Sequence, residues 1–241
     1  SSAANFAVPI MNKEKNKIIG SYSSEGINKL LSQLNSDRNV LLNLINKELF
    51  KNKIPKNDLN NFIIETPRKT FGGNILKLNN LKIFSSKFYQ AISEINNLIE
   101  GKRGPGTSFV YCNLVRAGGI ELFAEALNSN GYFEWNEDAD YDLKDDSRDS
   151  LTGMTLKEFK KKGNSISEFN PSTYILVTSG SEEGDDLPEV KQKIIRTIFN
   201  NVDNRHGKNI KLVLGSKVMN EGVTLENVKD VHILDVHYNL A

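Results

Sequence analysis

Apolar residues recur every three or four positions in the first part of the chain. Between residues 25 and 50 they form two stripes that are broken near residues 35–39, and this spacing predicts two amphipathic helices. A third stripe over residues 85–100, which a serine can cap, predicts another helix. Residues 51–80 are polar with scattered apolar pairs, so we assign no element to them.

From residue 107 onward the pattern changes to short β-rich runs separated by helical stripes. The runs at 107–114 and 174–178 favour strands, because they are rich in β-branched and aromatic residues. Each is followed by a glycine-containing segment and a helical stripe, over 120–130 and about 187–201. Strands that alternate with helices of this length predict a mostly parallel α/β sheet.

The end of the chain holds two further apolar runs with a small-residue segment between them. Ile210–Leu214 and Val231–Val236 fit neighbouring buried strands of such a sheet. Ligands of open α/β sheets bind at the carboxyl ends of strands. The segment 215–227 is therefore the first candidate for a functional loop.

Composition excludes several classes of protein. The 241 residues are 38% hydrophobic and 25% charged, which is typical of a soluble globular protein, and no apolar run is long enough to span a membrane. A single cysteine excludes an internal disulfide framework and a cysteine-based zinc site, and suits an intracellular compartment. Asp138, Asp140 and Asp142 match the start of a calcium loop, but Leu143 stands where that loop needs glycine. We expect no metal site.

The charge of the chain is unevenly divided although its net value is only +1. Residues 1–107 hold 16 Lys and Arg against 8 Asp and Glu, whereas residues 108–241 hold 15 against 22. This asymmetry indicates either a polyanionic or acidic partner for the first half or a lysine-rich solvated surface. The strand–helix alternation lapses at about 136–170, which predicts an insertion that is either solvated or a clamp for a partner.

Six segments of the chain match a known set of motifs in order and spacing. They are SSKF (85–88), FVYCNLVRAGG (109–119), YILVTSG (174–180), FNNVDNRHGKNIKLVLGS (199–216), GSKVMNEGVTLENVKDVHILD (215–235) and HYN (237–239). Together they resemble the second, C-terminal RecA-like domain of a superfamily 2 helicase or translocase. The resemblance is strongest in the motif V segment, and it is closest to the helicases of large DNA viruses of the poxvirus and mimivirus kind.

This resemblance implies an α/β fold, with a RecA-like, mostly parallel sheet and helices on both of its faces. It divides the chain into an N-terminal helical or irregular segment, 1–84, and a helicase C-terminal RecA-like domain, 85–241, that contains the insertion at about 136–170. The sequence ends at Ala241, where motif VI and its arginines should follow. We therefore expect a fragment that is truncated before motif VI.

The resemblance also implies two sets of site residues. Contacts with the nucleic-acid backbone would come from Asn113, Arg116, Gly180 and Ser216. One side of a nucleotide site between two RecA-like domains would come from Glu221, Gly222 and Thr224. Small residues let a backbone approach closely, and the Ser216 hydroxyl suits a phosphate oxygen. The alternative for Asn113, Ser216 and Thr224 is local capping or turn formation.

The sequence holds no complete site for nucleotide phosphates. Residues 101–106 have the glycine spacing of a P-loop, but Thr107 takes the place of the lysine and the segment leads from helix into strand, the reverse of the required order. No acidic DExx box is present either. We therefore expect no catalytic residues in this fragment and no hydrolysis by it alone; ATP and Mg²⁺ would bind to the full-length protein.

The leading hypothesis is thus a motor domain of an NTP-dependent DNA or RNA helicase or translocase. Its expected partners are DNA or RNA, the first RecA-like domain of the same polypeptide and viral transcription machinery, without a membrane. Its expected location is intracellular, in the virion or the host cytoplasm. The main alternative is a non-catalytic helicase-like scaffold of a viral transcription or replication complex. A weaker one is another two-domain α/β enzyme with a nucleotide in its cleft, such as a nucleotide-sugar transferase.

Overall fold

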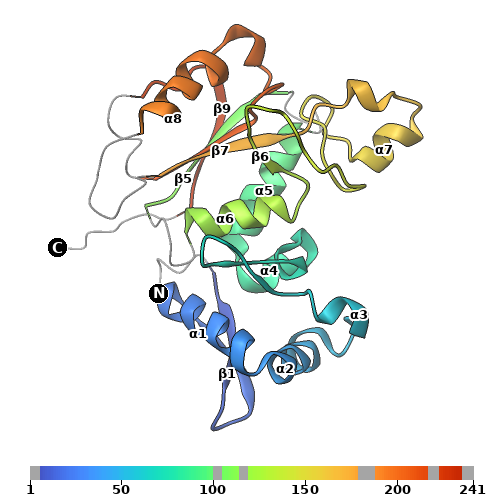
Figure 1. The fold of residues 1–241 in the computed structure, drawn as a ribbon, viewed down its shortest axis with the longest axis vertical. Coiled ribbons are helices and arrows are strands. Elements are labelled where there is room, and N and C mark those ends of the chain that lie inside the picture. Colours follow the sequence, from blue (N-terminus) through green and yellow to red (C-terminus); the bar gives the residue numbers. More distant parts are fainter. Residues whose placement is uncertain (1–5, 100–104, 114–118, 179–187, 217–222, 235–241) are drawn as a thin grey trace, which may run out of the picture.

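The computed structural model describes residues 6–99, 105–113, 119–178, 188–216 and 223–234. Figure 1 shows a central sheet with helices α5 and α6 below it and α8 above it. The N-terminal elements lie at the base of this view, and the segment that carries α7 projects to the right.

The sheet has five parallel strands in the order β6-β7-β8-β5-β9. Their bounds are β5 (Thr107–Tyr111), β6 (Phe133–Glu134), β7 (Thr173–Val177), β8 (Leu212–Gly215) and β9 (Val228–Ile233). The four strands predicted from apolar runs are all present. The two-residue strand β6 was not predicted, because a segment that short carries no recognisable period.

Helices cover both faces of the sheet, which confirms the predicted RecA-like α/β fold. Helices α5 (Ser86–Ile99) and α6 (Ile120–Asn128) pack on one face. On the other face lies α8 (Glu189–Ile194), which continues as the π-helix η3 (Ile195–Phe199). Strand β7 shows the division, since Leu176 packs with the first group and Ile175 and Val177 with the second.

The structure corrects the expectation that the last two strands are neighbours. Strand β5 lies between β8 and β9 and pairs in parallel with both. Strand β9 is also not buried on both sides: among the described strands it lies at the edge of the sheet, and its residues Val231 and Ile233 are 60% and 59% exposed. A short apolar run has the same appearance in a central and an edge strand, so the sequence could not separate the two.

The N-terminal part contains the two predicted helices and several elements that were not predicted. Helices α1 (Ser23–Ser36) and α2 (Arg38–Phe50) meet at Asp37. A hairpin precedes them, and Gln33 of α1 holds it by a side-chain pair of hydrogen bonds with the Met11 backbone, of 2.8 and 3.0 Å. The additional elements are β1 (Val8–Asn12), β2 (Lys17–Ser21), α3 (Lys56–Leu59), β3 (Ile64–Glu65), β4 (Phe71–Gly72), η1 (Asn74–Leu76) and α4 (Leu78–Phe84).

One hydrophobic core joins this N-terminal part to the lower face of the sheet. Phe6 makes ring contacts with Phe71, Phe84 and Phe88 at centroid distances of 5.5, 5.7 and 5.8 Å. Two of these rings lie before residue 85 and one lies after it. The division into 1–84 and 85–241 stays a prediction, and the core is continuous across it.

The predicted insertion forms a small lobe with its own core. It contains α7 (Leu156–Lys161) and η2 (Ile166–Glu168), and its buried residues Leu156, Phe159 and Phe169 pack together. A capping box between Thr155 and Glu158 begins α7.

Among the described residues, no helix has the length and apolar character needed to cross a membrane.

Candidate nucleic-acid and nucleotide interface

Three strands of the sheet end side by side at its carboxyl edge. The Cys112 backbone N–H donates to the Gly215 carbonyl at 3.0 Å, and the Ser216 N–H donates to the Val177 carbonyl at 3.3 Å. Asn113 and Ser216 therefore lie at the ends of adjacent strands, β5 and β8. The structure thus brings two of the predicted nucleic-acid residues to one edge of the sheet, and their role in binding stays a prediction.

The side chain of Ser216 is buried, with 1% of its surface exposed. Its Oγ has no hydrogen-bond partner among the described residues. A local cap would give this oxygen a nearby backbone partner, and the described residues supply none. Because Ser108 and Ser172, at the amino edge, also have buried Oγ atoms without a described partner, this property alone does not mark a site.

Asn113 lies at intermediate burial, and its Oδ1 accepts a hydrogen bond from the Tyr111 hydroxyl. Helix α6 starts at Ile120 and has Gly119 as its N-terminal cap, so Asn113 does not cap that helix. The other predicted nucleic-acid residues, Arg116 and Gly180, fall outside the described residues, as do Glu221 and Gly222 of the predicted nucleotide set.

Thr224, the remaining nucleotide candidate, is exposed and is positioned by its backbone. Its carbonyl accepts from Asn200 Nδ2 at 2.8 Å, while Asn200 Oδ1 accepts from the Glu226 N–H at 2.9 Å. Asn200 follows directly after η3, so it fixes the segment that leads into β9 against the end of that helix. Sequence reasoning missed this residue, although it stands inside the quoted segment 199–216.

A second asparagine of that segment closes the turn before β8. Asn204 is fully buried: its Nδ2 donates to the carbonyls of Phe199 and Ile210 at 3.0 and 2.9 Å, and its Oδ1 accepts from the N–H groups of Asn209 and Ile210 at 2.8 Å each. All four hydrogen-bonding positions of the amide are satisfied. The turn also needs Gly207, whose φ is +81° and whose added Cβ would lie 2.6 Å from Lys211 Cδ.

Comparison with known proteins places these features in a family. An inferred ATP-dependent RNA helicase of Acanthamoeba polyphaga mimivirus is 40% identical over 255 aligned residues, which cover the whole of this chain and 21% of that protein. A second mimivirus protein of the same description is 28% identical over 69% of the chain and 22% of its own length. An early transcription factor large subunit homolog of African swine fever virus is 27% identical over 69% of the chain and 14% of its own length. The chain is a viral helicase-like domain of superfamily 2.

This helicase-like domain spans about a fifth or less of the length of these relatives. No family model matches the chain. No solved structure matches it either.

A buried lysine connects two segments at the amino edge of the helicase-like domain. Lys211 has no exposed surface, and its Nζ donates to the carbonyls of Ser150 at 2.6 Å and His206 at 3.0 Å. Burial lowers the pKa of this amine to about 7, although Asp149 acts in the opposite direction. A neutral amine has two N–H donors, which match the two carbonyls. Lys211 thus ties the insertion to β8.

Asp149 supports the same connection from the insertion. Its Oδ2 accepts from the N–H and the hydroxyl of Thr152 at 2.9 and 2.7 Å, and its Oδ1 accepts from the Asn170 N–H at 2.7 Å. Asp149 is the twelfth residue counted from Asp138, the start of the apparent calcium loop, and its carboxylate makes internal hydrogen bonds. No group of three or more acidic, histidine or cysteine side chains in the described ranges could hold a metal ion.

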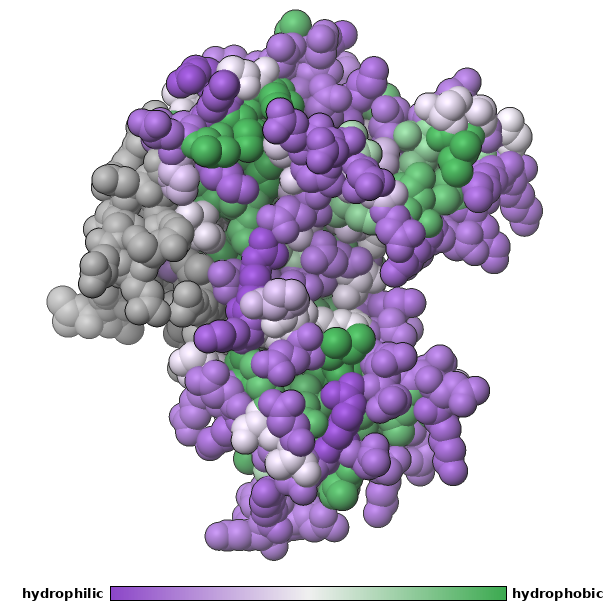
Figure 2. Space-filling view, viewed as in Figure 1, coloured by the Kyte–Doolittle hydropathy of each residue, from purple (hydrophilic) through white to green (hydrophobic). Residues whose placement is uncertain are grey.

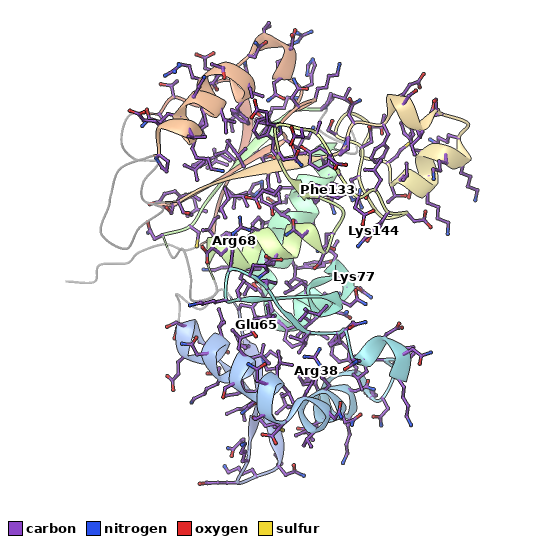
Figure 3. The ribbon with its side chains drawn as sticks, viewed as in Figure 1. Arg38, Glu65, Arg68, Lys77, Phe133 and Lys144 are labelled. Atoms are coloured by element: carbon purple, nitrogen blue, oxygen red, sulfur yellow. The ribbon has the colours of Figure 1, made fainter. Side chains whose placement is uncertain are left out.

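A charged cluster joins the N-terminal part of the helicase-like domain to β6. Arg68 Nη2 lies 2.8 and 2.9 Å from the two carboxylate oxygens of Glu134 (Figure 3 labels Arg68). Burial raises the pKa of the nearby Glu125 carboxyl. The buried Tyr174 hydroxyl donates to Asn128 Oδ1 at 2.8 Å. Arg68 pairs with Glu134, and Asn128 bonds to both Tyr174 and Glu125, so the cluster is a structural connection.

Proposed function

We propose that this helicase-like domain is the second, C-terminal motor domain of an ATP-dependent RNA or DNA helicase or translocase. The observation that carries the proposal is the position of Asn113 and Ser216 on adjacent strand ends at the carboxyl edge of a RecA-like sheet. Open parallel sheets bind their ligands at this edge. The mimivirus relative at 40% identity supports the same class.

In this proposal the nucleic-acid backbone runs along the carboxyl edge. Asn113 and Ser216, together with Arg116 and Gly180, contact its phosphates and sugars. Such contacts carry no sequence information, which suits a motor that moves along a strand. Because Ser216 Oγ is buried, its contact with a phosphate requires the atoms that cover it to move.

Glu221, Gly222 and Thr224 form one side of the nucleotide site. The 241 residues contain no P-loop lysine and no DExx box, so ATP and Mg²⁺ bind between this domain and the first RecA-like domain of the same polypeptide. Asn200 holds the carbonyl of Thr224 and the N–H of Glu226, and so couples the nucleotide segment to η3. The chain by itself hydrolyses no ATP.

The relatives favour a role in viral gene expression. Two are named as RNA helicases and others as early transcription factor subunits. We infer that the full-length protein acts with the viral transcription machinery, either in the virion or in the host cytoplasm.

The decisive experiment compares ATP hydrolysis by the full-length protein with and without single-stranded RNA or DNA. The proposal predicts stimulation by nucleic acid, a higher nucleic-acid concentration for half-maximal stimulation in Ser216→Ala, and a reduced maximal rate in Thr224→Ala. Ser108→Ala is the matched control, because its hydroxyl is equally buried at the opposite edge. An ATPase that ignores every nucleic acid contradicts the translocase function.

A non-catalytic scaffold is the second candidate, and the relation to the early transcription factor subunits favours it. It predicts a full-length protein that enters a transcription complex without hydrolysing ATP. Pull-down of viral polymerase by a full-length protein that shows no ATPase activity, with or without nucleic acid, supports this candidate against the motor.

A further inference from the structure

Two adjacent clefts lie at the N-terminal part, and the first of them also reaches the insertion. The first has a volume of about 640 Å³ and lies between α4, α5, the end of α6 and the insertion. The second, of about 600 Å³, lies between the end of α2, α3 and α4. Lys77 and Asn79 line both, so the two clefts are adjacent, and we refer to them together as the basic groove. Figure 2 shows the outline of the molecule indented at this place, on the right of the view below the insertion.

Positive charge predominates along this basic groove. Its lining includes five cations against two acids, Asp58 and Asp146; the cations are Lys51, Lys53, Lys77, Lys82 and Arg148. Within the part of the chain that the structure describes, no ion pair involves any of the four lysines. Figure 3 shows Lys77 on the rim of the N-terminal part, below Lys144 of the insertion.

Apolar side chains lie between these cations. The second cleft is lined by Phe50, Ile54 and Ile83, and Ile83 is 48% exposed. In the first cleft Lys82 Nζ lies 5.5 Å from the centre of the Tyr89 ring. A groove with cationic rims and apolar or aromatic walls fits a single strand, whose phosphates meet the lysines and whose bases meet the walls. A duplex keeps its bases stacked inside and would leave these walls unused.

The basic groove is separate from the carboxyl edge of the sheet. Helix α6 begins at Ile120, after the carboxyl end of β5, and ends at Asn128, whereas Ser129 and Asn130 line the groove. A helix of this length places the groove about 13 Å farther along, toward the amino edge.

We propose that the basic groove binds a single strand of nucleic acid, and so gives this domain a second contact surface away from the carboxyl edge. The inference rests on the proposed nucleic-acid function of the chain. It also explains the charge asymmetry of the sequence, since four of the five cations belong to the lysine-rich first half.

Fluorescence anisotropy with the 241-residue chain tests this binding. The probes are labelled oligothymidylate, oligouridylate and a blunt duplex of equal length. We expect both single strands to bind more tightly than the duplex. Lys77→Gln with Lys82→Gln should weaken single-strand binding about tenfold and lower the slope of log Kd against log salt by about 1.4, because each phosphate contact contributes about 0.7. Lys77→Arg with Lys82→Arg should restore both.

Lys15→Gln with Lys17→Gln is the control, because it removes the same charge from exposed positions in the turn of the β1–β2 hairpin and at the start of β2. Thermal unfolding of each variant checks that it folds. Equal binding by the groove variant and this control overturns the inference, as does an absence of single-strand binding by the wild-type chain. A third outcome also overturns it: if the chain binds polyglutamate but no oligonucleotide, and the groove variant weakens that binding, the partner of the groove is an acidic protein.

Ser216→Ala measured in parallel separates this inference from the proposed function. If Ser216→Ala weakens binding and the groove variant does not, the groove inference fails and the motor function stands. If the groove variant weakens binding but the full-length ATPase ignores nucleic acid, the groove stands and the motor function fails.

Discussion

The two edges of the sheet use their polar side chains differently. Three side chains at the amino edge bond to backbone groups. Asn204 bonds within the turn before β8, Lys211 bonds from the start of β8 to the insertion, and Asp149 bonds within the insertion. Together these bonds connect the insertion, the turn and the strand. At the carboxyl edge the described residues include backbone bonds between strand ends, and the Tyr111 hydroxyl donates to Asn113. The contrast teaches that these buried polar side chains at the amino edge serve the fold, whereas we propose that Asn113 and Ser216 at the carboxyl edge contact a ligand.

The largest expected effect lies at the amino edge. Asn204→Ala removes four hydrogen bonds and leaves two N–H groups and two carbonyls without their partner, so it should lower the free energy of unfolding by about 3 kcal/mol. Urea unfolding measures this loss. Asn209→Ala, at an exposed neighbour, is the control and should change stability by less than about 0.5 kcal/mol. Equal stability of the two variants contradicts the structural role of Asn204.

Lys211→Met should cost about 2 kcal/mol, because the carbonyls of Ser150 and His206 lose their donor. It should also change the pH dependence of stability. The lysine pKa is about 7 in the fold against its ordinary 10.5, so between these values the unfolded chain binds more protons and stability rises with pH.

The wild type should therefore gain about 1 kcal/mol per pH unit between about pH 7.5 and 9.5 from this group. Lys211→Met should lose that gain, whereas Lys208→Met, at an exposed position in the same turn, should keep it. Unfolding midpoints in urea across this range measure the slope. An unchanged slope in Lys211→Met means that the amine is not neutralised on folding.

A smaller effect is expected where the amino edge meets α6. Tyr174→Phe removes the hydrogen bond to Asn128 Oδ1 and keeps the ring, so it should lower stability by about 1 kcal/mol. Tyr22→Phe, at a side chain that is 50% exposed, should have no measurable effect. A thermal unfolding midpoint for Tyr174→Phe equal to that of Tyr22→Phe shows that this hydroxyl contributes nothing to folding.

The smallest effect on stability, and the most informative one, comes from two matched serines. Ser216→Ala and Ser108→Ala each remove a buried hydroxyl without a described partner, so both should change stability by less than about 0.5 kcal/mol. Only Ser216→Ala should weaken nucleic-acid binding, by several-fold. If both variants bind alike, the contrast between the two edges does not extend to function.

The sequence predicted those parts of the fold that follow from the period of apolar residues. The helices at α1, α2, α5 and α6, the helix η3 that continues α8, and the strands β5, β7, β8 and β9 all contain buried residues, and burial is what such patterns report. The strand order could not be predicted, because nothing in the apolar run at β9 shows that β5 lies between β9 and β8. The hairpin of β1 and β2 was not predicted for another reason. Most of β2 is exposed, so it has no alternating apolar pattern, and the hairpin is held by Gln33 of α1.

The sequence also predicted only part of the candidate site. Asn113 and Ser216 follow strands, so their shared edge could be inferred. The bonds of Asn200 to Thr224 and of Lys211 to Ser150 could not, because those partners lie in other segments and no period connects them. The basic groove could not be predicted from the sequence either, because its walls come from residues near 51, 77 and 148, which lie close together only in the folded chain.

The central position of β5 also governs when the domain can form. Ser108 pairs with Leu212, 104 residues later, and Thr107 pairs with Val228 later still. At typical synthesis rates the ribosome needs roughly 5 to 20 seconds to deliver the first of these partners. Closing so long a loop before any pairing is gained slows folding. The elements before β5 make mostly local contacts. We therefore expect a nascent chain to fold its N-terminal part first, and β5 to pair only after β8 and β9 have been synthesised.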